Sequence, residues 1–243
     1  MSSNDAVRAA RRFLRKCGFD LVRYEPNTHA LARRSRLLGA YDVDVVLDVG
    51  ANVGQYARQL RDIGYRGRIV SFEPVQAAYR RLSEAARSDG AWTPINCALG
   101  DVDGRVEIHV AGNSQSSSLF AMMPAHLTSE PASQYVGSEE IEIRRLDSCF
   151  HDFCSGQDNV LLKIDTQGFE KRVLEGAETS LMAIRTIQLE LSLVPLYEGE
   201  ALFDEMYRLV QSKGFQLVSI ETTFADKSSG QLLQFDGIFR RPQ

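Results

Sequence analysis

The stretch that decides the fold reads Val45-Val46-Leu47-Asp48-Val49-Gly50-Ala51-Asn52-Val53-Gly54, and Ser71-Phe72-Glu73-Pro74 follows it. The first part is an apolar run, typical of a strand buried on both sides, that ends in a glycine turn. The second ends in a carboxylate, and Glu73 lies 19 positions after Gly54. A strand, a glycine turn that opens a helix and an acid at the end of the next strand are how α/β folds hold a nucleoside. We therefore predict a nucleoside site in which Glu73 accepts hydrogen bonds from ribose hydroxyls.

The glycine turn is not the dinucleotide one, because its pattern is D-x-G-x-x-x-G rather than G-x-G-x-x-G. The Asp48 carboxylate would repel a pyrophosphate, which prefers a bare helix N-terminus. It would suit the ammonium group of S-adenosylmethionine, with Gly50, Asn52 and Gly54 shaping the pocket around the methionine part. An NAD-dependent oxidoreductase and a tight connection without a ligand are the alternatives.

From residue 43 onward the sequence alternates between strand and helix patterns, which indicates a parallel sheet with helices on both faces. A polar excursion interrupts the alternation at about 105–144, and it is too long for a plain connector. We predict an α/β domain over 43–243 with a Rossmann-like, mostly parallel sheet, a C-terminal antiparallel hairpin and a lid-like insertion at 105–144. The expected strands are 44–49, 68–72, 93–99, 160–164, 186–191, 215–220 and 232–240, and the expected helices are 54–63, 74–87, 170–176 and 201–213.

The 243 residues carry a net charge of −4, so the chain lacks the overall basic charge of a nucleic-acid-binding protein. Residues 1–40 nevertheless hold nine basic and three acidic side chains. We predict that residues 1–42 form a basic, mainly helical extension. Its basic residues either form a solvated helix face or contact an anionic surface such as a membrane.

The sequence contains neither the roughly 20 consecutive apolar residues of a membrane span nor the apolar core of a signal peptide. We expect a cytoplasmic protein, either free or peripheral to the inner face of the membrane. Its expected partner is a small-molecule or glycolipid acceptor rather than a nucleic acid, and its oligomeric state is open.

Further candidate donor-binding residues follow the third predicted strand. Ala98 and Leu99 end this strand, where an adenine ring would lie against apolar atoms. Asp101 is placed to reach the adenine amine, although a solvated turn acid is an equal alternative. Ser117 belongs to a run of three serines that either hydrogen-bonds the donor or the substrate or forms a flexible turn.

Three polar residues are candidates for the catalytic step. Asp165 ends the fourth strand of the parallel sheet, Glu190 lies near the end of the fifth, and His126 lies in the insertion. A general base or a metal would help a hydroxyl to act as a nucleophile. In a second arrangement Asp165, Glu190 and Asp236 would ligate Mg²⁺, which prefers oxygen ligands.

The chain resembles the FkbM-like S-adenosylmethionine-dependent methyltransferases. The matching pieces are Asp48–Gly54, Phe72–Pro74, Ala98–Asp101, Ser116–Leu119, Arg145–Asp147, Leu162–Glu170, Ile187–Ser192 and Phe235–Phe239, in the family's order. The glycine turn together with Lys163-Ile164-Asp165-Thr166-Gln167-Gly168-Phe169-Glu170 is highly specific. The resemblance implies a class I methyltransferase that acts on hydroxyl oxygens of sugars, glycolipids or polyketides.

We expect an S-adenosylmethionine-dependent O-methyltransferase acting on a sugar hydroxyl of a glycolipid or a glycosylated metabolite. A polyketide or other non-sugar hydroxyl is the nearest alternative. An oxidoreductase and a non-enzymatic binding module that kept the fold are the more distant ones.

Overall fold

The computed structural model describes residues 3–242. Its contacts divide the chain into two units, Met1–Tyr41 and Asp42–Gln243. The first unit holds two helices, α1 and α2, over Ser3–Lys16 and Ala30–Ala40. None of the helices in residues 3–242 has the length and apolar character that crossing a bilayer requires.

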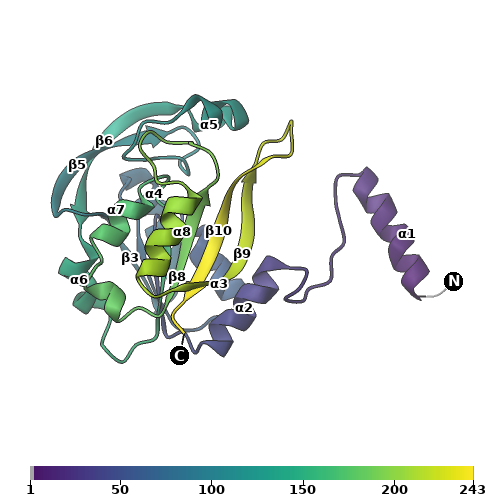
Figure 1. Cartoon of the computed structure of the whole chain (residues 1–243), viewed down its shortest axis with the longest axis horizontal. Helices are drawn as coiled ribbons and strands as arrows, with labels where there is room; N and C mark the ends of the chain where they lie inside the picture. The colour runs from purple at the N-terminus through teal and green to yellow at the C-terminus, as the bar shows by residue number, and fades with distance from the viewer. Residues whose placement is uncertain (1–2, 243) are drawn as a thin grey trace. The chain divides into compact units, whose positions relative to one another are not determined.

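The second unit is built on a seven-stranded sheet in the order β3-β2-β1-β7-β8-β10-β9 (Figure 1). The strands pair in parallel from β3 to β8, and β10 is antiparallel to both of its neighbours. This confirms the predicted mostly parallel sheet with a C-terminal hairpin. Its strands are β1 Val45–Val49, β2 Arg68–Phe72, β3 Trp92–Ile95, β7 Val160–Ile164, β8 Thr186–Ser192, β9 Gln216–Ala225 and β10 Leu232–Arg240.

The two faces of this sheet differ in character. One face, bearing Leu47, Leu162 and Leu189, forms the main apolar core with α6, α7 and α8, over Leu146–Phe153, Glu170–Glu175 and Phe203–Ser212. The opposite face carries Asp48, Lys163 and Gln188 in its buried centre. The crossover helices α3 and α4, over Gln55–Asp62 and Gln76–Ala86, connect β1, β2 and β3. A hydrogen bond from the Tyr56 hydroxyl to Gln188 Oε1 (2.8 Å) ties α3 to the polar face.

The predicted strand 93–99 is wrong as a single element, because the chain leaves the main sheet after β3. The side-chain amide of Asn96 donates hydrogen bonds to the carbonyl oxygens of Glu73 (2.9 Å) and Pro74 (3.0 Å). These two backbone acceptors lie just past the end of β2, and they are therefore bonded to a side chain. Ala98–Leu99 then forms β4 of a separate three-stranded sheet, in the order β4-β6-β5.

The excursion at 105–144 begins and ends in a regular antiparallel pair, β5 (Gly104–Ala111) with β6 (Tyr135–Arg144). Between these strands lie helix α5 (Pro124–Ser129) and the short helix η1 (Pro131–Ser133). A second short helix, η2, follows α7 at Ser180–Met182. Helix α6 was missed by the sequence analysis, which expected no element between residues 144 and 160. Figure 1 shows β5 and β6 beyond the ends of the main strands, on the same side as α5.

Candidate active site

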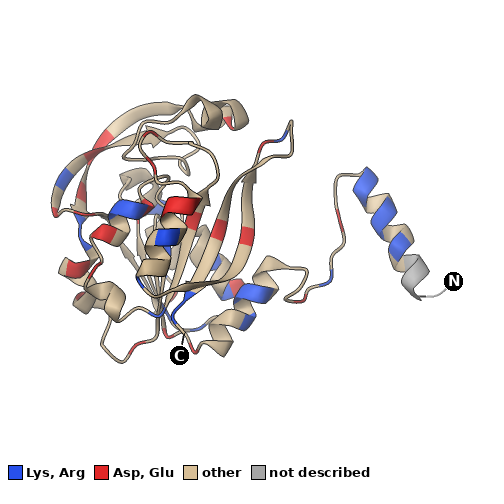
Figure 2. Ribbon diagram, viewed as in Figure 1, with Lys and Arg blue, Asp and Glu red and all other residues tan. Residues whose placement is uncertain are grey.

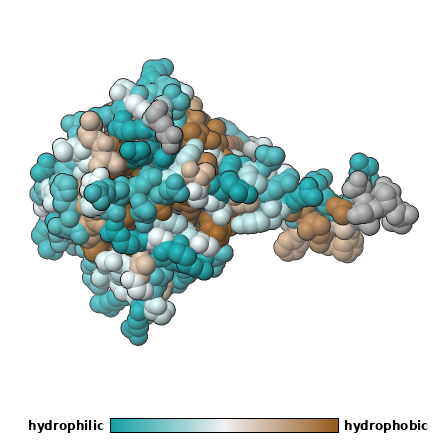
Figure 3. Space-filling view, turned by 90° about the horizontal axis from the view of Figure 1, so that it is seen from below, coloured by the Kyte–Doolittle hydropathy of each residue, from teal (hydrophilic) through white to brown (hydrophobic). Residues whose placement is uncertain are grey.

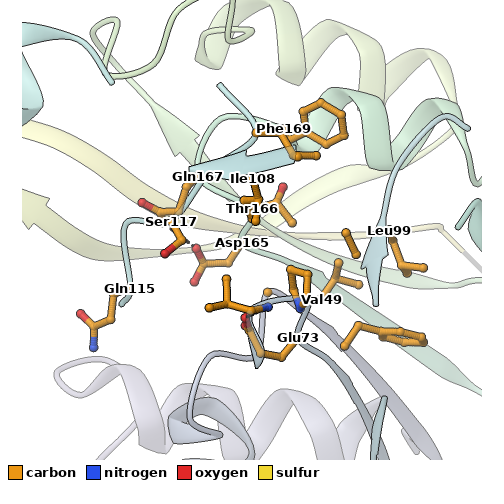
Figure 4. Close-up of a pocket in the computed structure, with 16 residues that line it drawn as sticks. Val49, Glu73, Leu99, Ile108, Gln115, Ser117, Asp165, Thr166, Gln167 and Phe169 are labelled. Atoms are coloured by element: carbon orange, nitrogen blue, oxygen red, sulfur yellow. Dashed lines mark hydrogen bonds between the residues drawn. The ribbon is translucent and has the colours of Figure 1, made fainter. Parts of the chain in front are cut away.

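A cleft lies where the carboxyl ends of β1, β2 and β7 meet the small sheet (Figure 4). In open α/β sheets this edge, at the strand where the winding direction changes, is where ligands bind. The cleft encloses about 530 Å³ of empty space, part of it open to solvent. Figure 4 shows Leu99 at one end and Asp165, Ser117 and Gln115 at the other, so the cleft has an apolar end and a polar end.

The turn after β1 passes very close to the end of β7. Gly50 has φ +75°, and a Cβ atom there would lie 1.8 Å from the carbonyl oxygen of Asp165. Gly54 has φ +82°, and a Cβ there would meet the Trp92 ring at 2.7 Å. Gly50 therefore lets the turn line the cleft while it packs against β7, whereas Gly54 does not line the cleft and lets the turn pack against Trp92.

Gly50→Ala is expected to lower the free energy of unfolding by about 2–5 kcal/mol, from left-handed strain and overpacking together. Gly64→Ala is the matched control, because Gly64 also has a positive φ (+91°) but no atom within 4 Å of the added Cβ. That control should cost only about 1–2 kcal/mol. Urea unfolding of both variants measures the difference, and equal losses would show that the contact with Asp165 is unimportant.

Glu73 lines the cleft and is only 6% exposed. Its carboxylate accepts hydrogen bonds from the backbone N–H groups of Asn52 (Oε2, 2.8 Å) and Val75 (Oε1, 2.8 Å). Burial raises the pKa of Glu73 to about 7, although these two hydrogen bonds oppose the shift. Each oxygen keeps a lone pair, so the carboxylate is held in place and still able to accept hydrogen bonds from a ligand.

Asn52 and Ser117 are both held by local hydrogen bonds. Asn52 has φ +48°, and its side-chain Oδ1 accepts a hydrogen bond from Ser114 (3.2 Å). Its Nδ2 is buried and has no hydrogen-bond partner among the described residues. Ser117 lines the cleft, and its hydroxyl accepts a hydrogen bond from the Ala111 N–H (3.1 Å) and donates to the Ser114 carbonyl (3.3 Å). The serine run is therefore an ordered part of the wall.

The structure corrects the role expected for Asp48, which does not line the cleft. Asp48 is fully buried, its Oδ1 lies 3.1 Å from Lys163 Nζ, and its Oδ2 accepts a hydrogen bond from Ser71 (3.1 Å). Residues alternate between the two faces of a strand, so Asp48 points into the polar face of the sheet rather than out of the strand end. Its charge is already matched by Lys163, and it cannot contact an ammonium group of a ligand in the cleft.

Asp101 also departs from its expected role, whereas Ala98 and Leu99 line the apolar end of the cleft as predicted. The Asp101 side chain pairs with Arg172 on α7, Oδ2 to Nη1 at 3.3 Å, and it is absent from the lining. Because the chain turns into the small sheet after Asn96, Asp101 lies past β4 and is directed toward α7.

Two of the candidate catalytic residues meet through a residue that the sequence analysis did not single out. Gln167 Nε2 donates to both Asp165 Oδ1 (2.8 Å) and Glu190 Oε2 (2.8 Å). Gln167 has φ +58°, and its Oε1 accepts a hydrogen bond from the Tyr197 hydroxyl (2.6 Å). A left-handed conformation in a non-glycine residue is strained and is typical of functional sites.

Within the described structure, hydrogen bonds reach only one of the two carboxylate oxygens of Glu190. Its Oε2 accepts from Gln167 and from Gln234 Nε2 (3.0 Å), and no hydrogen bond from the described residues reaches Oε1. Burial, together with the charges of Asp165 and Asp236, raises the pKa of Glu190 well above its usual range. Such a carboxylate is a stronger base than an ordinary glutamate.

A second cleft opens beside the first and shares Gln115 and Gln167 with it. It encloses about 830 Å³ of empty space, part of it open to solvent. Glu190 and His126 both lie in its wall, which consists of Asn113, Gln115, Ser116, His126, Glu130, Gln167, Glu190, Thr223, Phe224 and Gln234. Four of these ten side chains are amides, so the wall is rich in hydrogen-bond donors and acceptors.

His126 is held within the insertion, against the wall of the second cleft. It is 4% exposed, its Nε2 lies 3.3 Å from Ser116 Oγ, and its ring packs against Tyr197 and Phe224. Burial lowers the pKa of His126, which favours the neutral ring. Its Nδ1 is buried and has no hydrogen-bond partner among the described residues.

The residues suggested as Mg²⁺ ligands are not arranged as a metal site. Gln167 Nε2 lies between Asp165 and Glu190, and Asp236 accepts a hydrogen bond from Gln188 Nε2 (2.8 Å). Within residues 3–242, no group of three or more His, Cys, Asp and Glu side chains is placed to hold a metal ion. An amide N–H group occupies one oxygen of each of these three carboxylates.

Lys163 is the second residue whose importance the sequence analysis did not draw out. Its Nζ lies 3.1 Å from Asp48 Oδ1, 3.4 Å from Asp165 Oδ2 and within 3.5 Å of the Val49 and Gly50 carbonyl oxygens. It therefore joins the turn after β1 to the end of β7 from below the cleft. A charged residue within the apolar run Val160–Ile164 was the available signal.

A sequence profile of the FkbM methyltransferase domain matches residues 48–217, more than two thirds of the chain. The chain belongs to the FkbM methyltransferase family. The match confirms the family predicted from the motifs, and the sheet order is that of a class I methyltransferase. The oxidoreductase alternative is therefore set aside.

Two relatives of this FkbM protein match at moderate identity. The 2-O-methyltransferase NoeI of Sinorhizobium fredii is 28% identical over 184 residues, which cover 72% of this chain and 73% of NoeI. The methyltransferase sdnD of Sordaria araneosa is 23% identical over 195 residues, covering 71% and 73% of the two chains. Among solved structures, the magnesium protoporphyrin IX methyltransferase of Synechocystis PCC 6803 aligns with 87% of this chain and 78% of its own, at 11% identity and a TM-score of 0.49.

Proposed function

We propose that this FkbM protein is an S-adenosylmethionine-dependent O-methyltransferase whose acceptor is a sugar hydroxyl of a glycolipid or a glycosylated metabolite. The observation that carries the proposal is the pair of adjoining clefts, which meet at Gln167 between the carboxylates of Asp165 and Glu190. One cleft suits a nucleoside donor and the other a polyhydroxylated acceptor.

The first cleft has the groups that the donor needs. Its apolar end, at Ala98 and Leu99, suits an adenine ring, and the fixed Glu73 carboxylate suits ribose hydroxyls. Asn52 does not line this cleft, and its backbone N–H holds the Glu73 carboxylate in place. With Asp48 paired to Lys163, Asp165 is the carboxylate on the cleft wall that we assign to the donor's ammonium end. Bound S-adenosylmethionine would supply an electrophilic methyl group.

We assign the acceptor to the second cleft and the role of general base to Glu190. An acceptor hydroxyl bonded to Oε1 would give up its proton to that oxygen as its new bond to the methyl carbon forms and the methyl–sulfur bond breaks, which would leave the donor as a neutral thioether. Gln167 would hold the two carboxylates so that Asp165 faces the donor and Glu190 the acceptor. Most of the rate enhancement would come from alignment of the donor methyl group with the acceptor oxygen, because methyl transfer is an in-line displacement.

The polar wall favours a sugar over a polyketide acceptor. A polyketide offers long apolar segments, whereas this wall consists mostly of polar side chains that would be buried against those segments without gaining hydrogen bonds. The matched relative NoeI is named a 2-O-methyltransferase, which supports oxygen as the methylated atom. We therefore propose O-methylation, with a non-sugar hydroxyl as the second candidate.

Calorimetric titration with S-adenosylmethionine and, separately, NAD tests the donor first. We then expect methyl transfer from labelled S-adenosylmethionine to at least one compound in a panel of oligosaccharides and glycolipids, with hydroxylated polyketides as the comparison group. Transfer to the polyketides alone would overturn the sugar assignment. Tight donor binding without transfer to any hydroxyl would favour the non-enzymatic alternative.

Glu73→Ala is expected to weaken S-adenosylmethionine binding by about 10- to 100-fold, because a hydrogen bond to a charged group contributes about 1.5–3 kcal/mol. Calorimetry gives the affinity, and thermal unfolding checks that the fold survives. Glu73→Gln is the matched variant, since it keeps one acceptor oxygen but not the charge. Unchanged donor affinity in Glu73→Ala would overturn the ribose assignment.

The pH dependence of donor binding gives a second test of Glu73. Its pKa of about 7 means that the carboxylate forms as the pH rises through neutrality, and the ionised form is the better acceptor for ribose hydroxyls. Affinity should therefore rise about tenfold from about pH 6 to about pH 8 in the wild type. Any titration of the donor itself is common to both proteins, so the rise should be smaller in Glu73→Gln. An identical rise in the two would exclude Glu73 as its origin.

A further inference from the structure

Helix α1 has two chemically distinct faces. At 100° per residue, Val7, Ala10, Phe13, Leu14 and Cys17 fall within an arc of about 120°. The basic residues Arg8, Arg11, Arg12, Arg15 and Lys16 fall on the remaining side, within an arc of about 140°. Figure 2 shows the basic residues repeating along this helix, and Figure 3 shows hydrophobic residues gathered along one side of it.

The apolar side of this segment is exposed. The exposed fraction is 68% for Phe13 and 69% for Phe19, and Val7, Leu21, Val22 and Tyr24 are also exposed. Single exposed apolar residues are ordinary, but a contiguous exposed set marks an interaction surface.

The end of α1 extends the apolar face and keeps it apart from the basic one. Gly18 has φ +82°, the Phe19 N–H donates to the Leu14 carbonyl (3.0 Å), and the Gly18 N–H donates to the Arg15 carbonyl (3.2 Å). This is a Schellman motif, which characteristically brings the residue after the glycine against the last apolar turn of the helix. Phe19 therefore continues the apolar stripe.

Asp20, the next residue, faces the basic side. Its carboxylate pairs with Arg11 Nη2 (3.1 Å) and Arg15 Nη2 (2.9 Å). Asp20 is therefore shared between two guanidinium groups. The other three basic residues of this side, Arg8, Arg12 and Lys16, have no ion pair in the described structure. The basic side therefore keeps a net positive charge directly beside an exposed apolar stripe.

We propose that residues 7–24 form a membrane-docking segment that binds an anionic phospholipid surface. The basic side would lie among the lipid phosphates, and the apolar stripe would enter the boundary between headgroups and acyl chains. A nucleic acid would match the basic side but leave Phe13 and Phe19 in water. An apolar groove of a protein would bury the stripe but leave the cations unmatched. The proposal stands independently of the methyltransferase assignment.

Cosedimentation of the full chain with vesicles tests the proposal. We expect binding to phosphatidylcholine vesicles that contain about one third phosphatidylglycerol, and at least tenfold weaker binding to phosphatidylcholine alone. Raising the salt to about 0.5 M should weaken binding to the anionic vesicles, because it screens the basic side. Equal affinity for both vesicle types would overturn the proposal.

Matched variants separate the two sides of the helix. Phe13→Ser and Arg12→Gln should each weaken vesicle binding several-fold and leave S-adenosylmethionine binding unchanged. Val136→Ser and Arg208→Gln are the controls, because both residues are as exposed but lie on β6 and α8 of the other unit. Wild-type vesicle binding in Phe13→Ser would overturn the insertion of the apolar stripe.

Tryptophan fluorescence reports whether the stripe enters the bilayer. Phe13→Trp should shift its emission to shorter wavelength on anionic vesicles, whereas Trp92 is buried and gives a constant background. An unchanged emission wavelength would mean that the helix is held at the surface by charge alone, and this would overturn the proposal as stated. Two further outcomes would also overturn it, namely binding to single-stranded RNA but not to vesicles, and self-association without vesicles that Phe13→Ser abolishes.

Discussion

Lys163→Met is expected to lower the free energy of unfolding by about 3–5 kcal/mol, because it leaves a buried charge without a partner. Asp48 is 0% exposed and lies 3.1 Å from Lys163 Nζ, and its other described partner is the Ser71 hydroxyl. Burial on its own would lower the pKa of Lys163, but the carboxylates of Asp48 and Asp165 raise it above its ordinary value. Lys163 is therefore charged at neutral pH, and the two residues form an ion pair.

Urea unfolding measures this loss, and a double variant checks its origin. Asp48→Asn with Lys163→Met removes both charges, so it should recover a large part of the stability lost in Lys163→Met alone. The single variant should also weaken donor binding, since Lys163 contacts the Gly50 carbonyl and the Asp165 carboxylate. A loss below about 1 kcal/mol would mean that water reaches the pair and that Asp48 is not isolated by the substitution.

Glu190→Gln is expected to reduce turnover by about 10²- to 10⁴-fold, the usual contribution of a general base, with little change in donor affinity. The glutamine keeps the hydrogen-bonding shape but cannot take a proton. Turnover is measured as methyl transfer to a positive acceptor from the oligosaccharide panel, and donor affinity by calorimetry. Turnover close to that of the wild type would remove Glu190 from the mechanism.

The pH profile distinguishes the base from its neighbours. A base must be ionised, so turnover should rise with pH through the pKa of Glu190, which lies above the usual range for glutamate. Glu190→Gln should lose this rise. Asp165→Ala should weaken donor binding, because Asp165 is assigned to the donor's ammonium end, but its residual activity at saturating donor should still rise with pH. Asp236→Asn removes a charge that raises the pKa of Glu190, so it should move the rise to lower pH.

Much of the donor cleft could be predicted from local sequence. Gly50, Glu73 and Asp165 were placed by strand ends and turns, and all three line the cleft. The reason is geometric, because parallel strands bring their carboxyl ends to one edge of the sheet whatever surrounds them. A glycine that must take a positive φ is likewise a local requirement.

The errors lie where side-chain direction matters more than position along the chain. Asp48 is one residue from the end of β1, but the alternation of a strand turns it into the polar face, toward Lys163. Asp101 follows the turn into the small sheet and meets Arg172 instead of the cleft. The partners, Lys163 and Arg172, are both far along the chain from the acids that they pair with. The local sequence pattern around each acid therefore could not reveal its partner.

The sequence by itself determined the family, most of the strands and helices of the main sheet and the edge of that sheet that carries the site, because these depend on short-range periodicity and on motifs. The tertiary structure alone decided which carboxylates are free. Gln167 joins Asp165 to Glu190, and Lys163 neutralises Asp48, across strands that are distant in the chain. Charge and hydrogen-bond partners act through space over a few ångströms, so only the folded chain specifies them.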